Sequence, residues 1–218
     1  MGVQKALPFL RELNNNNNRE WFHNNKTWYE EAKKEFEIFL DELIIETGKF
    51  DENIKYLNSK DCIFRIYKDI RFSKDKTPYK TNFGGYIVPG GKNSGRAGYY
   101  LHIQPDNSFI AGGIYMPAPE ILKAVRQEIY YNISEFKEIM NNLVFKKYFN
   151  GIDGEVISRP PKDFPKEFPD IDLLKYKSYN VLCPLEDIEI TSEGLFDYVI
   201  AAFKAMSPFN KFLNRSFA

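Results

Sequence analysis

Several kinds of residue and segment are scarce in this 218-residue chain. It has two Cys and two His, which is too few for a disulfide framework and leaves no ligand spacing for a zinc site. No apolar run approaches the about 18 residues that a membrane span needs. Lys and Arg number 30, as do Asp and Glu, so the chain lacks the basic excess that is usual in a dedicated duplex-DNA binder.

The composition that remains is typical of a globular domain. Hydrophobic residues make up 43% and aromatic residues 16%, enough for a sizeable core, and the length predicts a single domain over residues 1–218. The opening MGVQKALPFLREL lacks the apolar core of a signal peptide, and Ala6 stands where a myristoylation motif requires Ser or Thr. Because Cys62 and Cys183 are isolated thiols, we expect a cytoplasmic protein. The lack of a long apolar run and of metal-ligand spacing predicts no membrane partner and no metal, and we expect no cofactor.

Apolar residues at three- and four-residue steps predict helices in both halves of the chain. Five consecutive Asn residues, 14–18, predict a loop that ends in the N-cap of a helix near Arg19. A long amphipathic helix follows over residues 26–47, and Pro119 suits the first position of a later helix. A last helix is expected from about Leu195.

The middle of the chain predicts an antiparallel meander of about four strands. The turn residues Pro105, Asp106 and Asn107 separate two of them, and the short spacing leaves no room for crossover helices. The fold class is therefore α+β, with a mainly antiparallel sheet flanked by helices. The expected strands cover residues 62–72, 83–88, 99–104 and 108–115, with a further short strand at 179–183.

The most distinctive stretch runs from residue 62 to residue 81, CIFRIYKDIRFSKDKTPYKT. Its first half alternates apolar and polar residues, as the two faces of a strand do. We therefore expect a strand over residues 62–72 with Phe64, Ile66 and Ile70 buried. The polar members of the alternation are Arg65, Tyr67, Asp69 and Arg71, while Lys68 interrupts the apolar face.

The second half of this stretch predicts an exposed loop rich in cations. Pro78 disfavours helix at Thr77, and the residues around it are polar. Between Lys60 and Lys80 the chain carries seven Lys or Arg against three Asp.

The motif RIYKDIRFSKDKTPYKT resembles the signature of the DUF2461 family, a group of bacterial and fungal proteins without an assigned function. Three further segments resemble the same family in the same order: NNNREWFHNNKTWYE, GYYLHIQP and GGIYMPAPEILKAVRQEI. The resemblance covers most of the chain and implies homology and a single domain. It implies no catalytic residue and no cofactor, so the functional interpretation depends on the residues themselves.

Two interpretations of the cationic stretch stay open. Arg presents two parallel donors to a phosphate or carboxylate and Lys adds point charge, which favours recognition of an anionic ligand. Alternatively, alternating Arg and Asp on an exposed face form a structural network of ion pairs. Under the first interpretation Asp69 orients an Arg, and the ligand-binding residues are Arg65, Tyr67, Arg71, Lys74, Lys76, Tyr79 and Lys80.

A candidate acid–base residue lies on the predicted strand 99–104. Tyr100, His102 and Gln104 share one face there, and His titrates near neutral pH. If the protein is an enzyme, His102 and Asp69 are the candidate catalytic residues; the alternative is a hydrogen-bonded structural His. The Gly-rich loop that precedes this strand lacks the Walker A pattern, but its Lys92 and Arg96 can close over a bound anion.

Two rivals to a small anionic ligand come from other classes of function. A nucleic-acid module would lay a phosphate backbone along the same cations and stack bases on Tyr79, Phe72 or Trp21. A protein-interaction surface would use the stretch without any chemistry. A steep dependence of binding on salt concentration distinguishes a nucleic acid from one small anion.

Overall fold

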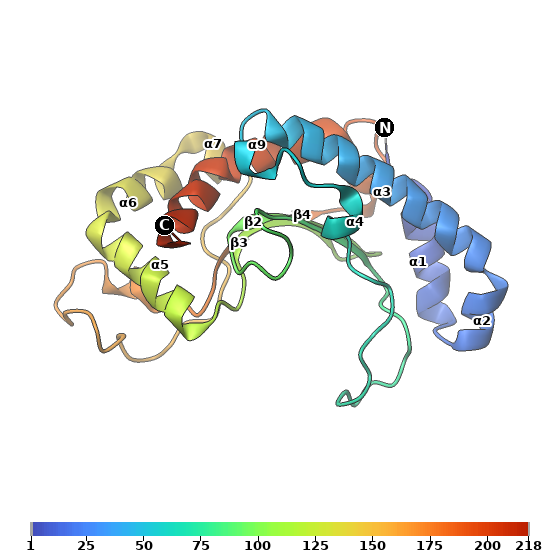
Figure 1. Cartoon of the computed structure of the whole chain (residues 1–218), viewed down its shortest axis with the longest axis horizontal. Coiled ribbons are helices and arrows are strands. Elements are labelled where there is room, and N and C mark those ends of the chain that lie inside the picture. Colours follow the sequence, from blue (N-terminus) through green and yellow to red (C-terminus); the bar gives the residue numbers. More distant parts are fainter. Residues whose placement is uncertain (1, 218) are drawn as a thin grey trace.

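The computed structural model describes residues 2–217, and Met1 and Ala218 lie outside the described residues. Figure 1 shows an arch, in which two long helices, α3 and α9, lie over a sheet and the other helices lie towards the two sides. The helices are α1 (Ala6–Asn15), α2 (Arg19–Asn24), α3 (Lys26–Gly48), α4 (Ser59–Cys62), α5 (Pro119–Tyr131), α6 (Ile133–Asn141), α7 (Leu143–Lys146), α8 (Asp187–Ile190) and α9 (Leu195–Asn214), with short 3-10 turns η1 (Glu52–Ile54), η2 (Ile171–Leu174) and η3 (Arg215–Phe217).

The four strands form one antiparallel sheet in which each strand pairs with the next along the chain. This arrangement confirms the α+β class and the four-stranded meander. The turn at Pro105–Asn107 was expected, and there Asp106 takes a positive φ of 60°, which Asp tolerates better than most residues. The strands are β1 (Phe83–Ile87), β2 (Gly98–Ile103), β3 (Ser108–Ile114) and β4 (Tyr179–Leu185).

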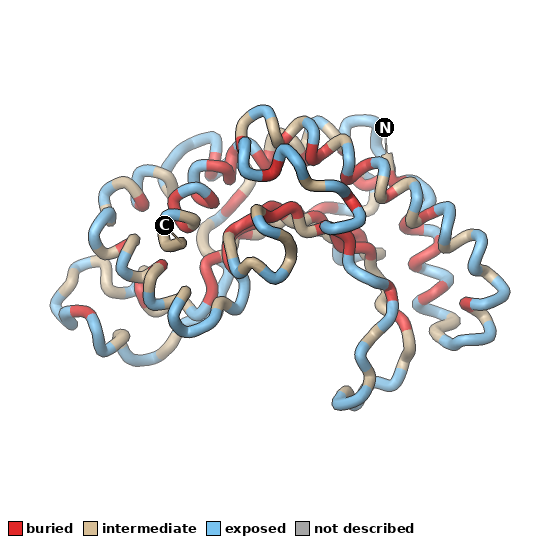
Figure 2. The backbone as a smooth tube through the Cα atoms, viewed as in Figure 1, coloured by how far each residue is buried: buried red, intermediate tan, exposed pale blue. Residues whose placement is uncertain are grey.

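The prediction of a strand over residues 62–72 is wrong, and β4 supplies the fourth strand instead. The stretch begins as the end of α4 and continues as extended chain with isolated bridges at Ile63 and Tyr67. Of the three residues expected inside, Ile66 is buried at 2% exposure, Phe64 is 37% exposed and Ile70 is only half-buried. The alternation failed because this segment runs out beyond the sheet, where there is no core beneath it (Figure 2).

Helices α3 and α9 cover one face of the sheet. Phe36 of α3 stacks on Phe83 of β1 with ring centroids 5.7 Å apart, and Phe203 of α9 lies 5.1 Å from the ring of Tyr99 on β2. All four side chains are buried. The apolar stripe predicted for residues 26–47 therefore packs on the strands, as an amphipathic helix requires.

The other face of the sheet carries no helix among the described elements (Figure 1). Its side chains are half-buried rather than buried, among them Tyr86, Tyr100, His102 and Phe109. No helix within residues 2–217 has the length and apolar character needed to cross a bilayer.

Candidate cationic pocket

The segment Ile63–Thr81, here called the cationic hairpin, leaves the sheet and folds back on itself. Three backbone bonds hold its two arms or join it to β1: Phe64 donates to the carbonyl of Gly84 at 2.9 Å, Lys68 to Pro78 at 2.9 Å, and Lys80 to Ile66 at 2.7 Å. So few backbone bonds leave side-chain contacts to define the hairpin's shape.

An ion pair between two neighbouring residues of one arm lies near the tip of the hairpin. The guanidinium of Arg71 donates to both carboxylate oxygens of Asp69, from Nε at 2.9 Å and from Nη2 at 2.6 Å. This side-chain bond holds the pKa of Asp69 below its usual value. The Arg71 side chain is 76% exposed. Asp69 occupies the Nε and Nη2 donors of its guanidinium, while the remainder of the side chain faces solvent.

A second carboxylate fixes the return of the chain. Asp75 accepts hydrogen bonds from Lys68 Nζ at 2.7 Å and from the backbone N–H of Thr77 at 2.9 Å. These bonds, led by the one from Lys68, lower the pKa of Asp75. The turn before Pro78 is therefore an Asp-centred one, and Lys68 is anchored at its base.

The Asn-rich loop anchors the hairpin to the N-terminal helices. The side chain of Asn17 accepts a bond from the backbone N–H of Tyr79 at 3.1 Å and donates to the carbonyl of Tyr79 at 3.0 Å. The next residue, Asn18, caps α2 by accepting from the N–H of Trp21 at 2.9 Å. The predicted N-cap is confirmed, and the loop also aligns the hairpin with α2.

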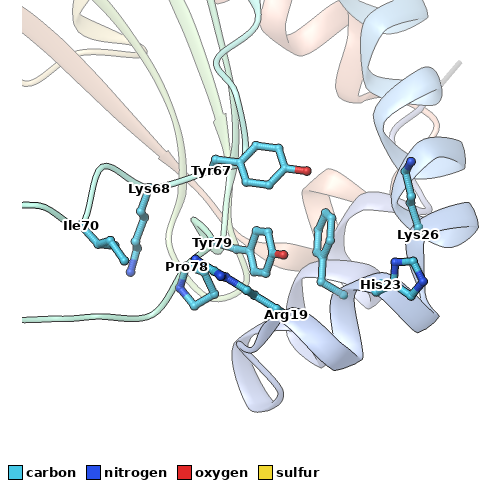
Figure 3. A pocket seen from close by; sticks show the side chains of 9 residues that line it. Arg19, His23, Lys26, Tyr67, Lys68, Ile70, Pro78 and Tyr79 are labelled. Carbon is cyan, nitrogen blue, oxygen red and sulfur yellow. The ribbon is translucent and has the colours of Figure 1, made fainter.

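Between α2 and the hairpin lies a cavity of about 620 Å³. Figure 3 shows the labelled basic residues on two sides, Arg19, His23 and Lys26 on the helices and Lys68 on the hairpin, with Arg19 extending towards Pro78. None of the described residues that line it is an Asp or a Glu. The lining residues are Arg19, Phe22, His23, Lys26, Tyr67, Lys68, Ile70, Pro78 and Tyr79.

Aromatic rings form one wall of this cavity. Phe22 stacks on Tyr79 with centroids 3.9 Å apart and planes at 14°. The ring of Tyr67 lies 5.4 Å from that of Tyr79 and is 51% exposed. Burial raises the pKa of Tyr79, and the charge of Arg19 opposes this rise. The pocket thus combines cations, phenol hydroxyls and an apolar wall.

The cations of the pocket differ in how far they are neutralised. Within the part of the chain that the structure describes, Arg19 has no carboxylate within ion-pair distance, while Lys26 has only Glu30 at 3.7 Å. Lys68 is paired with Asp75 at 2.7 Å. Arg19 is accordingly the cation with most capacity to bind an added anion.

His102 lies elsewhere, on the open face of the sheet. The Nε2 atom of His102 lies 2.9 Å from Gln104 Oε1, and because an amide oxygen can only accept, Nε2 carries the proton. The other ring nitrogen, Nδ1, accepts a hydrogen bond from the hydroxyl of Tyr100 at 2.8 Å. Phe109 stacks on the imidazole at 4.5 Å. Burial lowers the pKa of His102. The polar face predicted for residues 100, 102 and 104 exists as a chain of hydrogen bonds.

The structure divides the residues predicted as one site among three places. Tyr67 and Tyr79 line the pocket; Asp69, Arg71, Lys74 and Lys76 lie at the tip; Arg65, Lys80 and His102 lie towards the sheet. The sequence reasoning missed Arg19, His23 and Lys26. The four-residue spacing of Arg19 and His23, which puts both side chains on one side of a helix, was the available signal, whereas Lys26 begins the next helix.

Comparison with known proteins identifies one matching family. The family described as conserved hypothetical protein (DUF2461) matches residues 5–212. The chain belongs to the DUF2461 family. A search of curated proteins and a search of solved structures each returned no match.

Proposed function

We propose that this DUF2461 protein binds a small anionic molecule, carrying a phosphate or a carboxylate, in the pocket between α2 and the cationic hairpin. The observation that carries the proposal is the pocket's lining, which contains Arg19, His23, Lys26 and Lys68 and no Asp or Glu. Lys68 and Lys26 have carboxylate partners in Asp75 and Glu30, but Arg19 has none within ion-pair distance among the described residues, so a bound anion would neutralise it.

Each lining group has a role that follows from its chemistry. Arg19 presents a planar pair of donors to two oxygens of the anion, and Lys26 adds a mobile point charge. Lys68 is held in place by Asp75 at the base of the turn. The half-exposed ring of Tyr67 offers a flat apolar surface, so the ligand we expect carries a ring or an apolar group beside its charge.

The proposal changes the set of residues expected to hold the anion. Arg71, which the alternation pattern suggested, is outside the pocket and bonded to Asp69. Tyr67 and Tyr79 keep their proposed role. Arg19, His23 and Lys26 take the place of the cations at the tip.

The experiment is a thermal melt in sodium phosphate and in sodium chloride of equal ionic strength. Binding to the folded state raises the melting temperature by mass action, so phosphate should stabilise the wild type more than chloride does. Arg19→Gln should reduce this increment, whereas the matched control Arg71→Gln should keep it in full. Equal melting curves of the wild type in the two salts would refute the proposal.

One observation favours a nucleic acid as a second candidate. Phe72 at the tip is 96% exposed and lies among Arg71, Lys74 and Lys76, so a base could stack there while the cations contact phosphates. Binding of a single-stranded oligonucleotide would then weaken steeply with salt and would be lost in Phe72→Ala. Retention of oligonucleotide binding in that variant would exclude the tip.

A cytoplasmic location is part of the proposal. Cys62 and Cys183 are free thiols, both buried, as is usual for proteins of a reducing compartment. Thiol counting under denaturing, non-reducing conditions should return both thiols in protein purified without reductant.

A further inference from the structure

Two lysines lie around the ring of Phe64, where the hairpin meets the sheet. Lys80 Nζ lies 5.4 Å from the ring centroid and Lys92 Nζ lies 5.6 Å from it. Arg65 is the next residue after Phe64, and the backbone bond from Lys80 to Ile66 at 2.7 Å puts it one residue from the position opposite Lys80. These residues come from both arms of the hairpin and from the Gly-rich loop before β2.

This group has no carboxylate of its own. Among residues 2–217, no Asp or Glu lies within ion-pair distance of Arg65, Lys80 or Lys92. Lys92 donates instead to the neutral carbonyl of Ile63 at 2.7 Å. The bond from Arg71, and to a lesser extent the charge of Arg65, lower the pKa of Asp69. Both carboxylate oxygens of Asp69 are bonded to Arg71.

Lys80 and Lys92 are half-buried, which makes the crowding more costly than it would be on an open surface. Water screens exposed charges well and partly buried ones less. Burial, and then the charge of Arg65, lower the pKa of Lys80, and no acidic group offsets either effect. The lysine is therefore held in a place that favours a bound anion.

The surroundings of Phe64 supply a polar wall. Its ring meets Tyr100 edge-on, with centroids 6.2 Å apart, and the Tyr100 hydroxyl is bonded to His102. The hydroxyl lies over Gly84, where an added Cβ would come within 2.5 Å of it. A glycine at that position makes room for the tyrosine, so the wall depends on a residue of β1.

We infer that Arg65, Lys80 and Lys92 form a second anion-binding site, for a phosphate or carboxylate group, where the hairpin meets the open face of the sheet. It shares no residue with the pocket lined by Arg19. Two arginine- and lysine-lined sites beside one hairpin fit a ligand with two anionic groups or two separate ligands. The inference stands whether or not the first pocket binds anything.

The test is a titration of the protein labelled at lysine Cε, followed by carbon NMR, with inorganic phosphate as the probe. We expect the signals of Lys80 and Lys92 to move and saturate while the signal of Lys74, an exposed lysine of the same hairpin, stays nearly constant. Bound phosphate should also raise the pKa of Lys80, because the anion stabilises the charged form.

Variants separate the two sites. Arg65 is exposed and bonded to no other described side chain, so Arg65→Gln should fold normally and weaken the phosphate response of Lys80 about fivefold, the equivalent of one exposed ion pair. Arg19→Gln should leave that response unchanged even where it abolishes binding at the pocket. The inference is overturned if Lys80 and Lys92 do not respond to phosphate, if Lys74 responds equally, or if Arg65→Gln has no effect.

Discussion

Strand β2 and the cationic hairpin are both extended chain with antiparallel partners, yet they are built in opposite ways. β2 pairs along its length with β1 and β3, and Tyr99, Leu101 and Ile103 are fully buried. The hairpin has isolated bridges and buries few side chains, of which Ile66 and Tyr79 are two. One segment is held by backbone bonds and core packing and the other by ion pairs.

The difference shows how this fold frees a segment for recognition. A strand beneath two helices cannot present cations, since a buried charge without a partner is very costly. A hairpin beyond the sheet can carry many, because water solvates those that stay unpaired. Its shape is then fixed by a small number of polar contacts, such as those of Asn17 and Asp75.

The largest expected effect is on the β2 side of the comparison. Leu101 is fully buried, and Leu101→Ala removes apolar contacts and leaves a cavity. We expect the free energy of unfolding to fall by about 2–5 kcal/mol, measured by urea denaturation. A loss below that range would mean that the sheet is not the core of the molecule.

A smaller effect is expected at the base of the hairpin. Ile66 is 2% exposed, but the segment around it is held by few bonds and can collapse into the space left by Ile66→Ala. The loss should lie near the lower limit for such a change, about 2 kcal/mol, and amide exchange should accelerate in the hairpin more than in β2. Equal acceleration in both segments would contradict the distinction drawn between them.

The third effect depends on pH. Burial lowers the pKa of His102 below its ordinary 6.5, so the unfolded chain takes up the proton more readily than the folded one. Stability should therefore be complete above pH 6.5 and decline as the pH falls below it. Melting curves of His102→Gln should lack this decline, whereas those of His23→Gln, which replaces an exposed His, should keep it.

The smallest effect is at the tip. Arg71 is highly exposed and pairs with Asp69 in solvent, where ion pairs contribute little to stability. Arg71→Ala should leave the thermal melt nearly unchanged in the absence of ligand. A marked fall in melting temperature would instead support the alternative that the Arg and Asp residues of this stretch form a structural network of ion pairs.

The sequence predicted the sheet better than the hairpin, for a physical reason. The strand near residues 99–104 alternates along its length, the segments 83–88, 108–115 and 179–183 are short and apolar, and turn chemistry lies between two of them, at Pro105–Asn107. The segment 62–72 has the same alternation, but alternation does not say whether a core lies beneath. Lys68, the residue that broke the apolar face, was the local sign that it does not.

The pocket could not be predicted from the sequence because it is formed by segments that lie far apart along the chain. Asn17 and Tyr79 are 62 positions apart, and no local pattern indicates that they bond. Without that contact, Arg19 and Tyr67 belong to unrelated elements. The aromatic wall was likewise hidden, since Phe22 reads as an ordinary core residue of a short helix.

The most direct test of the pocket is a phosphate titration followed through the backbone amide signals of the whole protein. The account predicts saturable shifts at Arg19, His23 and Tyr67, with β2 unaffected at Leu101. Shifts that are centred instead on residues 69–76, or the absence of any saturable shift at Arg19, would contradict it.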